Sequence, residues 1–256
     1  MTELLVDQIA VLSDNYVYLV RDGASGTTAV VDPAVAEPVR AALAQRDWRL
    51  DFILNTHHHS DHVGGNLALK QWSGARIIGP ASDADRIPGI DVGLDDNDRF
   101  ALGQAIATIL AVPGHTRGHI AFWFADAATL FCGDTLFALG CGRMFEGTPE
   151  QMWASLKKLR ALPDATRVYC AHEYTEANAR FARTIEPDNP ILAARAESVA
   201  ARRRRGLPTV PSLLGEEKAT NPFLRADVAA LQAAMGMAGG DPAAVWGQLR
   251  RRKDVF

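Results

Sequence analysis

Cysteine is scarce in this chain of 256 residues, and its scarcity excludes a fold held together by disulfides. The three cysteines, Cys132, Cys141 and Cys170, are odd in number, and none belongs to a CxxC pair. Disulfide frameworks usually carry an even number of cysteines, and they are rare where the surroundings are reducing. The cysteine content therefore fits a reducing cytosol, and we expect a cytoplasmic location.

Long apolar runs and a large excess of charge are also missing. The first twenty residues contain Glu3 and Asp7 and no basic leader, so they do not resemble a signal peptide. No uncharged apolar stretch reaches the roughly 18 residues of a membrane helix. The formal net charge of −3 argues against a protein that binds nucleic acid through bulk positive charge. We therefore expect neither a membrane nor a nucleic acid as partner.

The order of apolar runs predicts a mixed fold. The runs LLVDQIAV, NYVYLV and TTAVVDP, separated by turn residues, are typical of an antiparallel meander. Helical spacing at 36–47 and 64–72 alternates with the strand-like runs DFILNT and ARIIGP. A further amphipathic helix is predicted at 148–162, with Thr148 as its N-cap. From about Thr175 only helices are predicted, so we expect an α+β chain with domains at 1–175 and 176–256.

Histidine is concentrated in one place: four of the seven histidines lie between His57 and His62, together with Asp61. Alternate side chains of an extended segment share a face, which puts His57, His59 and Asp61 together and His58 opposite. His62 joins them only if the chain turns, as the glycines at 64 and 65 favour. Such a cluster supplies more ligands than one open catalytic site usually takes from so short a segment, which indicates two metal ions.

Three more polar residues follow apolar runs and support this interpretation. His115 and His172 resemble residues at strand ends, and Asp134 would be costly to bury without a cation, so its position suits a bridging ligand. Nitrogen and oxygen donors are compatible with zinc, iron or manganese. For His58, whose parity opposes its neighbours, and for His119, a structural role is the better interpretation. Arg202 to Arg205, just before Gly206, are typical of a basic last helical turn.

The ordered segments THHHSDH, GHTRGH, FCGDT and AHEYT resemble the metallo-β-lactamase superfamily. The resemblance covers roughly residues 1–175 and implies a four-layer αββα sandwich with two β-sheets face to face. It also implies that two divalent metals are bound, with zinc expected first. Its ligand assignment gives His57, His59 and His115 to one metal, Asp61, His62 and His172 to the other, and Asp134 to both.

Four later segments, CGRMFEG, HEYT, TNPFLR and RRRKDVF, are similar to those of the hydroxyacylglutathione hydrolases, or glyoxalases II. The resemblance then spans essentially the whole chain and gives the helical C-terminal domain a part in substrate binding. It implies a set of substrate-binding residues: Arg143, Phe145, Tyr174, Arg250 and Lys253. Many relatives carry lysine and tyrosine where this chain has Arg143 and Phe145, so one phenolic hydrogen bond is absent, whereas the positive charge is kept.

The activity implied by this resemblance is hydrolysis of S-D-lactoylglutathione to glutathione and D-lactate, the second step of methylglyoxal detoxification. The nucleophile would be a hydroxide that bridges the two metals, oriented by Asp61 and Asp134 as catalytic residues. We expect a monomer whose partner is this small thioester. A glutathione persulfide dioxygenase, another hydrolase or nuclease of the superfamily, and a binding module without activity are the alternatives.

Overall fold

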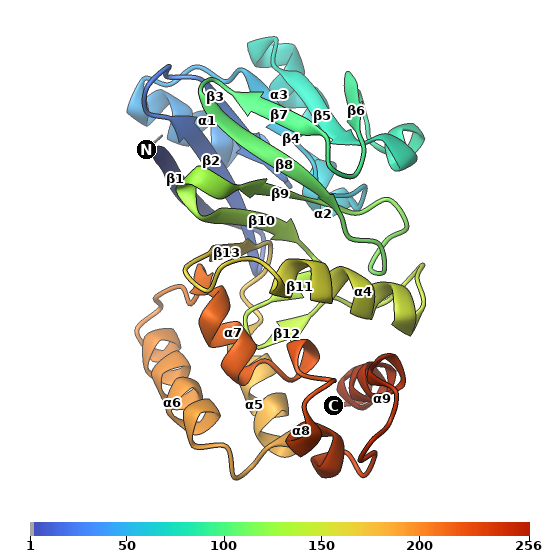
Figure 1. Ribbon diagram of the computed structural model, residues 1–256. Coiled ribbons are helices and arrows are strands. Elements are labelled where there is room, and N and C mark those ends of the chain that lie inside the picture. Colours follow the sequence, from blue (N-terminus) through green and yellow to red (C-terminus); the bar gives the residue numbers. More distant parts are fainter. Residues whose placement is uncertain (1–2) are drawn as a thin grey trace. The chain divides into compact units, whose positions relative to one another are not determined.

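The structure is a computed structural model that describes residues 3–256, and its chain forms two compact units (Figure 1). The first unit contains the residues up to Ala111 together with Arg117–Gly133. The second contains Val112–Thr116 and Asp134–Phe256. The domain boundary expected after residue 175 stays a prediction. Among the described residues, no helix combines the length and the apolar character that crossing a membrane requires.

One sheet of the first unit has six strands in chain order. Its members are β1 (Leu4–Val11), β2 (Asn15–Asp22), β3 (Thr28–Val31), β4 (Phe52–Leu54), β5 (Arg76–Pro80) and β6 (Val92–Leu94). The first three are antiparallel, which confirms the predicted meander, and β3 to β6 are parallel. Parallel strands need crossover connections. Helix α1 (Glu37–Arg46) connects β3 to β4, α3 (Asn66–Ser73) lies between β4 and β5, and a 3-10 helix (Ala81–Arg86) lies between β5 and β6.

These two helices pack against one face of the six-stranded sheet (Figure 1). Val39 and Leu43 of α1 and Leu69 of α3 are fully buried in one apolar cluster with strand residues such as Ile53 and Ile77. The helical spacing of Val39 and Leu43 in the sequence predicted this face of α1. The packing fixes the carboxyl ends of β3 and β4, where polar residues follow.

A second set of strands in the first unit faces the other side of that sheet. It is antiparallel, in the order β10 (Thr129–Gly133), β9 (Ile120–Phe124), β8 (Ala105–Ala111) and β7 (Arg99–Leu102). Aromatic pairs join the two sets: the ring centroids of Tyr18 and Phe131 are 5.5 Å apart, and those of Phe52 and Phe100 are 5.1 Å apart. The strands of the first unit therefore form the face-to-face sandwich that the resemblance implied.

The second unit is mainly helical. Its helices are α4 (Pro149–Arg160), α5 (Thr175–Ile185), α6 (Pro190–Arg204), α7 (Leu214–Thr220), α8 (Ala229–Ala234) and α9 (Pro242–Asp254), and its short strands are β11 (Leu136–Phe137), β12 (Gly140–Cys141), β13 (Arg167–Cys170) and β14 (Ser212–Leu213). β11 and β12 form a hairpin, and β13 pairs with β14. The expectation of helices alone after Thr175 was wrong at β14.

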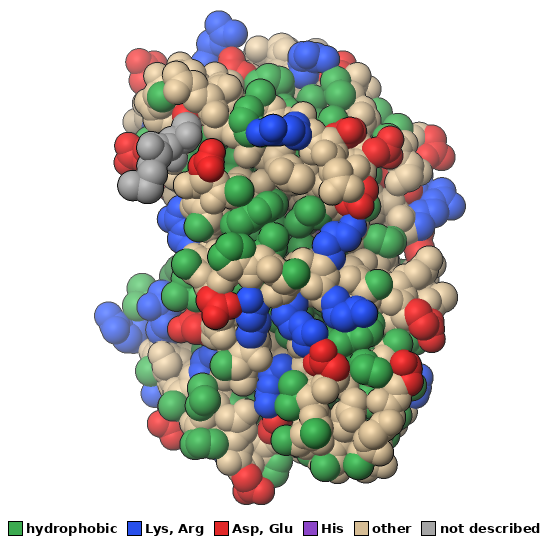
Figure 2. Space-filling view, in the orientation of Figure 1, with side chains coloured by type: hydrophobic (Ala, Val, Ile, Leu, Met, Phe, Trp, Pro, Cys, Tyr) green, Lys and Arg blue, Asp and Glu red, His purple; other side chains and the backbone are tan. Residues whose placement is uncertain are grey.

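Two helices of the second unit, α4 and α6, carry basic residues in their last turns, where the helix dipole favours positive charge. On the face drawn in Figure 2, lysine and arginine side chains gather over α4, whose last turn carries Lys157, Lys158 and Arg160. The helix α6 likewise ends in arginines, and Gly206 follows with a φ of +69°. Positive charge at the carboxyl end of a helix is favourable. The run of arginines before Gly206 is thus a basic last turn, as predicted.

Candidate metal centre and ligand cavity

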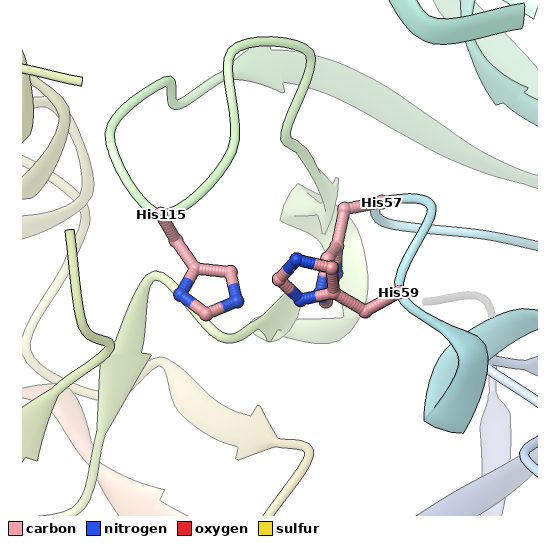
Figure 3. A group of neighbouring side chains, drawn as sticks. All are labelled: His57, His59 and His115. Atoms are coloured by element: carbon pink, nitrogen blue, oxygen red, sulfur yellow. The ribbon is translucent and has the colours of Figure 1, made fainter. Parts of the chain in front are cut away.

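The segment after β4 gathers imidazoles because its alternate residues point in opposite directions. His57 Nε2 and His59 Nδ1 are 3.0 Å apart, and their rings are drawn in Figure 3. Two nitrogen ligands on one tetrahedral zinc ion are separated by about 3.3 Å, so this spacing suits a shared ion. His58 turns away, with Nδ1 3.3 Å from the Asp83 carboxylate and Nε2 accepting from Arg86. The parity argument is confirmed for these three histidines.

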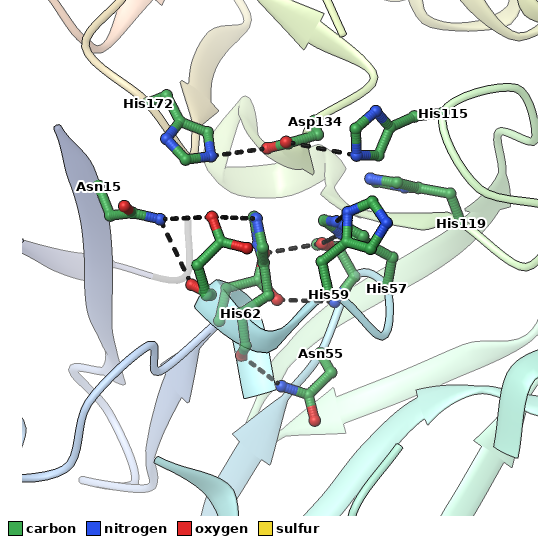
Figure 4. A network of polar contacts seen from close by, with 12 residues as sticks. Asn15, Asn55, His57, His59, His62, His115, His119, Asp134 and His172 are labelled. Atoms are coloured by element: carbon green, nitrogen blue, oxygen red, sulfur yellow. Dashed lines mark hydrogen bonds and ion pairs between the residues drawn. The ribbon is translucent and has the colours of Figure 1, made fainter. Parts of the chain in front are cut away.

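The same argument was wrong for Asp61, because the extended segment ends before it. A short helix, α2 (Ser60–Val63), begins one residue earlier and carries both Asp61 and His62. The helix brings Asp61 Oδ2 to 3.6 Å from His62 Nε2. Asn15, which Figure 4 labels and which lies at the start of β2, donates from Nδ2 to the Asp61 carboxylate (3.1 Å) and to the Asp61 backbone carbonyl (3.3 Å). Asp61 is therefore held by helix geometry and by Asn15.

Asp32, which sequence reasoning missed, decides the tautomer of His62. Its Oδ2 is 3.1 Å from His62 Nδ1, and because a carboxylate only accepts, Nδ1 carries the proton and Nε2 keeps its lone pair. Thr56 donates to the same carboxylate from its backbone N (2.8 Å) and its Oγ1 (2.7 Å). Such an orienting carboxylate is the usual partner of a metal-binding histidine. The signal was present: Asp32 ends a buried strand, as Asp134 does.

Asp134 lies between two histidines of its own unit, as Figure 4 shows. Its Oδ2 is 3.4 Å from His115 Nε2, and its Oδ1 is 3.4 Å from His172 Nε2. Each carboxylate oxygen thus faces a different imidazole, at about the separation of two ligands on one ion. Asp134 is thus placed where a carboxylate could reach two cations, and the donor set of nitrogen and oxygen fits zinc, iron or manganese.

A backbone carbonyl fixes the orientation of the His115 ring. The His115 Nδ1 donates to the Arg143 carbonyl (2.7 Å), which leaves Nε2 directed at Asp134. A Cβ on Gly142 would lie 1.9 Å from the Asp134 carbonyl oxygen, so only glycine fits there. The other histidine of this segment, His119, is buried, and its Nδ1 lies 3.0 Å from the Ile120 carbonyl. A hydrogen-bonded structural histidine is what the sequence predicted at His119.

A cavity of about 560 Å³ opens beside His115 and Asp134 within the second unit. It is also lined by the five residues predicted to bind substrate: Arg143, Phe145, Tyr174, Arg250 and Lys253. The structure therefore gathers all five around one space. Tyr174 stacks on the His172 ring with centroids 4.8 Å apart, and Phe145 meets His115 edge to face at 5.2 Å.

The three cations of this cavity differ in their surroundings. The Arg143 side chain is 67 % exposed, whereas that of Arg250 is 7 % exposed. Partial burial holds the pKa of Lys253 below its ordinary value, and the nearby positive charges of Arg250 and Arg180 lower it further. Burial also raises the pKa of the Cys141 thiol to about 12, so this cysteine is not a nucleophile.

Comparison with known proteins finds two family models that together match residues 11–256. Residues 11–172 match the family model of the metallo-beta-lactamase superfamily, and residues 173–256 match that of the hydroxyacylglutathione hydrolase C-terminus. A crystal structure of TTHA1623 in a di-iron-bound form is 25 % identical with a TM-score of 0.62, and the match covers 86 % of this chain and 99 % of that one.

Relatives named hydroxyacylglutathione hydrolase are similar over the full length. The one from Methylococcus capsulatus is 62 % identical over all of this chain and 99 % of its own length. The one from Rhodospirillum rubrum is 57 % identical over all of both chains. Since both the sandwich and the C-terminal helices are matched, the chain belongs to the hydroxyacylglutathione hydrolases of the metallo-β-lactamase superfamily.

Proposed function

We propose that the protein hydrolyses thioesters between glutathione and a 2-hydroxy acid, with S-D-lactoylglutathione as the substrate that yields glutathione and D-lactate. The observation that carries the proposal is a single cavity lined both by His115 and Asp134 and by cationic side chains. Glutathione has two carboxylates and one ammonium group, so a pocket for it needs a few placed cations. The full-length similarity to relatives named hydroxyacylglutathione hydrolase supports the same substrate class.

Two divalent cations belong to this proposal. The family assignment gives His57, His59 and His115 to one cation. It gives Asp61, His62 and His172 to the other, with Asp134 on both. The 3.0 Å approach of His57 to His59 and the two 3.4 Å contacts of Asp134 support these ligands. Zinc is the ion we expect first, with iron or manganese as the alternatives, because nitrogen and oxygen donors accommodate all three.

When bound, such cations supply hydroxide from water near neutral pH and offset negative charge on the carbonyl oxygen. The protein's own groups orient the reactants. Asn15 fixes the Asp61 carboxylate, and Asp32 fixes His62. Arg143 and Lys253 bind glutathione carboxylates, while Phe145 and Tyr174 provide apolar walls.

The chemistry needs no further acid. A carbon–oxygen bond forms, the carbon–sulfur bond breaks, and glutathione leaves as a thiolate. A thiol has a pKa of about 8.5, so its thiolate departs without a general acid at neutral pH. This explains a site whose cavity offers no serine or accessible cysteine among its lining residues.

The test is a thiol-release assay on S-D-lactoylglutathione with metal analysis of the same preparation. We expect about two metal ions per chain and loss of turnover after chelation, restored by zinc. Oxygen uptake with glutathione persulfide, in place of thiol release, would assign the dioxygenase alternative. Full turnover by metal-free protein would contradict the proposal.

A further inference from the structure

Arg250 lines the ligand cavity, yet its guanidinium is bound by the protein on three sides. Its Nε and Nη2 lie 3.1 Å and 3.0 Å from Asp254 Oδ1, one helical turn along α9. Its Nη1 donates to the Cys141 carbonyl at 3.0 Å. The guanidinium also lies 5.3 Å from the centroid of the Phe223 ring. With these contacts and 7 % exposure, the Arg250 side chain holds the Cys141 backbone as well as lining the cavity.

The backbone that Arg250 holds leads directly to the proposed metal ligands. Cys141 ends β12, and the next two residues contact both Asp134 and His115. Gly142 has its Cα packed so closely that an added Cβ would lie 1.9 Å from the Asp134 carbonyl and 3.0 Å from His115 Nδ1. The Arg143 carbonyl accepts the proton of His115 Nδ1 at 2.7 Å. A shift of the Cys141–Arg143 backbone would therefore move the group that selects the His115 tautomer.

The rest of the β11–β12 hairpin is fixed by uncharged or anionic groups. Asn221 donates from Nδ2 to the Phe137 and Gly140 carbonyls, and Glu217 accepts from the Leu139 backbone N. Cys141 is the residue where the hairpin leaves these anchors and continues to Arg143. The Arg250 guanidinium binds the backbone at this point, at the Cys141 carbonyl.

We infer that Arg250, oriented by Asp254, is a positioning residue for the metal ligand His115. It acts through the Cys141–Arg143 backbone. The inference rests on the proposed function in one respect, that His115 holds a cation. It gives the C-terminal helix α9 a second role besides lining the substrate cavity, because a buried charge on α9 then controls the imidazole that faces Asp134. Metal-binding histidines depend on such supporting hydrogen bonds for about 10- to 100-fold in affinity.

Lys253 offers a matched comparison on the same helix. It also lines the cavity and is cationic, but the only protein acceptor described for its Nζ is the Ala177 carbonyl at 3.3 Å. Within the described residues, Lys253 Nζ donates to Ala177 and not to the backbone of the Cys141–Arg143 segment, as Arg250 does. A role in substrate binding alone predicts that Arg250 and Lys253 variants behave alike. The positioning role predicts that they differ in metal affinity.

The experiment measures zinc affinity of the full-length protein by competition with a chromogenic chelator, and kcat and KM with S-D-lactoylglutathione. For Arg250→Met we expect zinc to bind the site of His57, His59 and His115 about 10- to 100-fold less tightly, with a lower kcat even after zinc saturation. For Lys253→Met we expect a higher KM with zinc affinity unchanged. If Arg250→Met raises KM alone, or if Lys253→Met weakens zinc equally, the positioning role is wrong.

A second variant keeps the test decisive where Arg250→Met does not fold. Asp254→Asn removes the charge that orients Arg250 at a side chain 41 % exposed, and it should weaken zinc binding in the same direction by several-fold. Wild-type zinc affinity in Asp254→Asn would contradict the inference. Zinc affinity is read without substrate, so absence of thioesterase activity in the wild-type protein would overturn the proposed function separately.

Discussion

A single carboxylate, Asp32, sets the ligand nitrogen of His62, and this leads to a prediction at the scale of one residue. In Asp32→Asn the amide group that replaces Oδ2 would donate to His62 Nδ1. The proton of His62 would then move to Nε2, which could no longer bind a metal. We expect zinc affinity to fall about 10- to 100-fold, measured by chelator competition.

The matched control is Asp47→Asn. Both aspartates adopt a left-handed backbone, with φ of +49° and +53°, and asparagine tolerates this region well. Asp47 ends α1 at the surface, so its variant should bind zinc like the wild type. Equal zinc affinity in both variants would show that Asp32 does not orient His62.

A pH effect on substrate binding follows from Lys253. Burial, with Arg250 and Arg180 nearby, lowers the pKa of Lys253 from 10.5, so the free protein loses this cation at a lower pH than an ordinary lysine would. Binding of a substrate carboxylate favours the protonated form. KM should therefore rise with pH through the lowered pKa of Lys253. Lys253→Met should have a higher KM without this rise, and an identical pH profile in both proteins would refute the assignment.

The sequence predicted which side chains lie close together better than the reasons for their placement. Alternation correctly separated His58 from His57 and His59, because the backbone there is not yet helical. It failed for Asp61, because a four-residue helix is too short for periodicity to reveal. Asp32 is 30 positions before His62. Its place after a buried strand could have marked it as a candidate, but no local pattern identifies His62 as its partner.

Among the elements, α4 shows how sequence alone fixes a helix start. Thr148 Oγ1 accepts from the Gln151 backbone N at 3.3 Å, and Gln151 Oε1 accepts from the Thr148 backbone N at 3.0 Å, forming a capping box. Thr148→Ala removes one of these bonds and should cost about 1 kcal/mol of unfolding free energy in urea titration. Thr148→Ser, which keeps the hydroxyl, should stay near wild type. A loss of equal size in both variants would point away from capping.

An element without such signals was missed. β14 has two residues, and it lies in a stretch where no apolar period is long enough to detect. The predicted helix at 64–72 is in fact α3, beginning at Asn66 after the two glycines. Gly64 and Gly65 leave no room for side chains, since a Cβ on either would lie within 2.8 Å of a backbone carbonyl of the segment that follows β3. Tertiary packing therefore decided this boundary.

For the whole molecule, the proposed metals link function to stability. Asp61 and Asp134 bring negative charge close to several imidazoles. Cations that bind the folded chain but not the unfolded chain would stabilise the fold. One site at a hundredfold excess of metal over its Kd contributes about 2.7 kcal/mol. For a chain of this size, each kcal/mol corresponds to about 2–4 °C in Tm.

We therefore expect chelation to lower Tm by roughly 5–10 °C for each site that it empties, and zinc to restore it in a concentration-dependent way. Calorimetry of the chelated and zinc-loaded protein measures this shift. Asp134→Ala is the control, because it removes the carboxylate whose two oxygens face His115 and His172. In Asp134→Ala the zinc-dependent part of the shift should largely vanish. If Tm is unchanged by chelation in the wild type, the histidines and aspartates do not hold a metal that stabilises the fold.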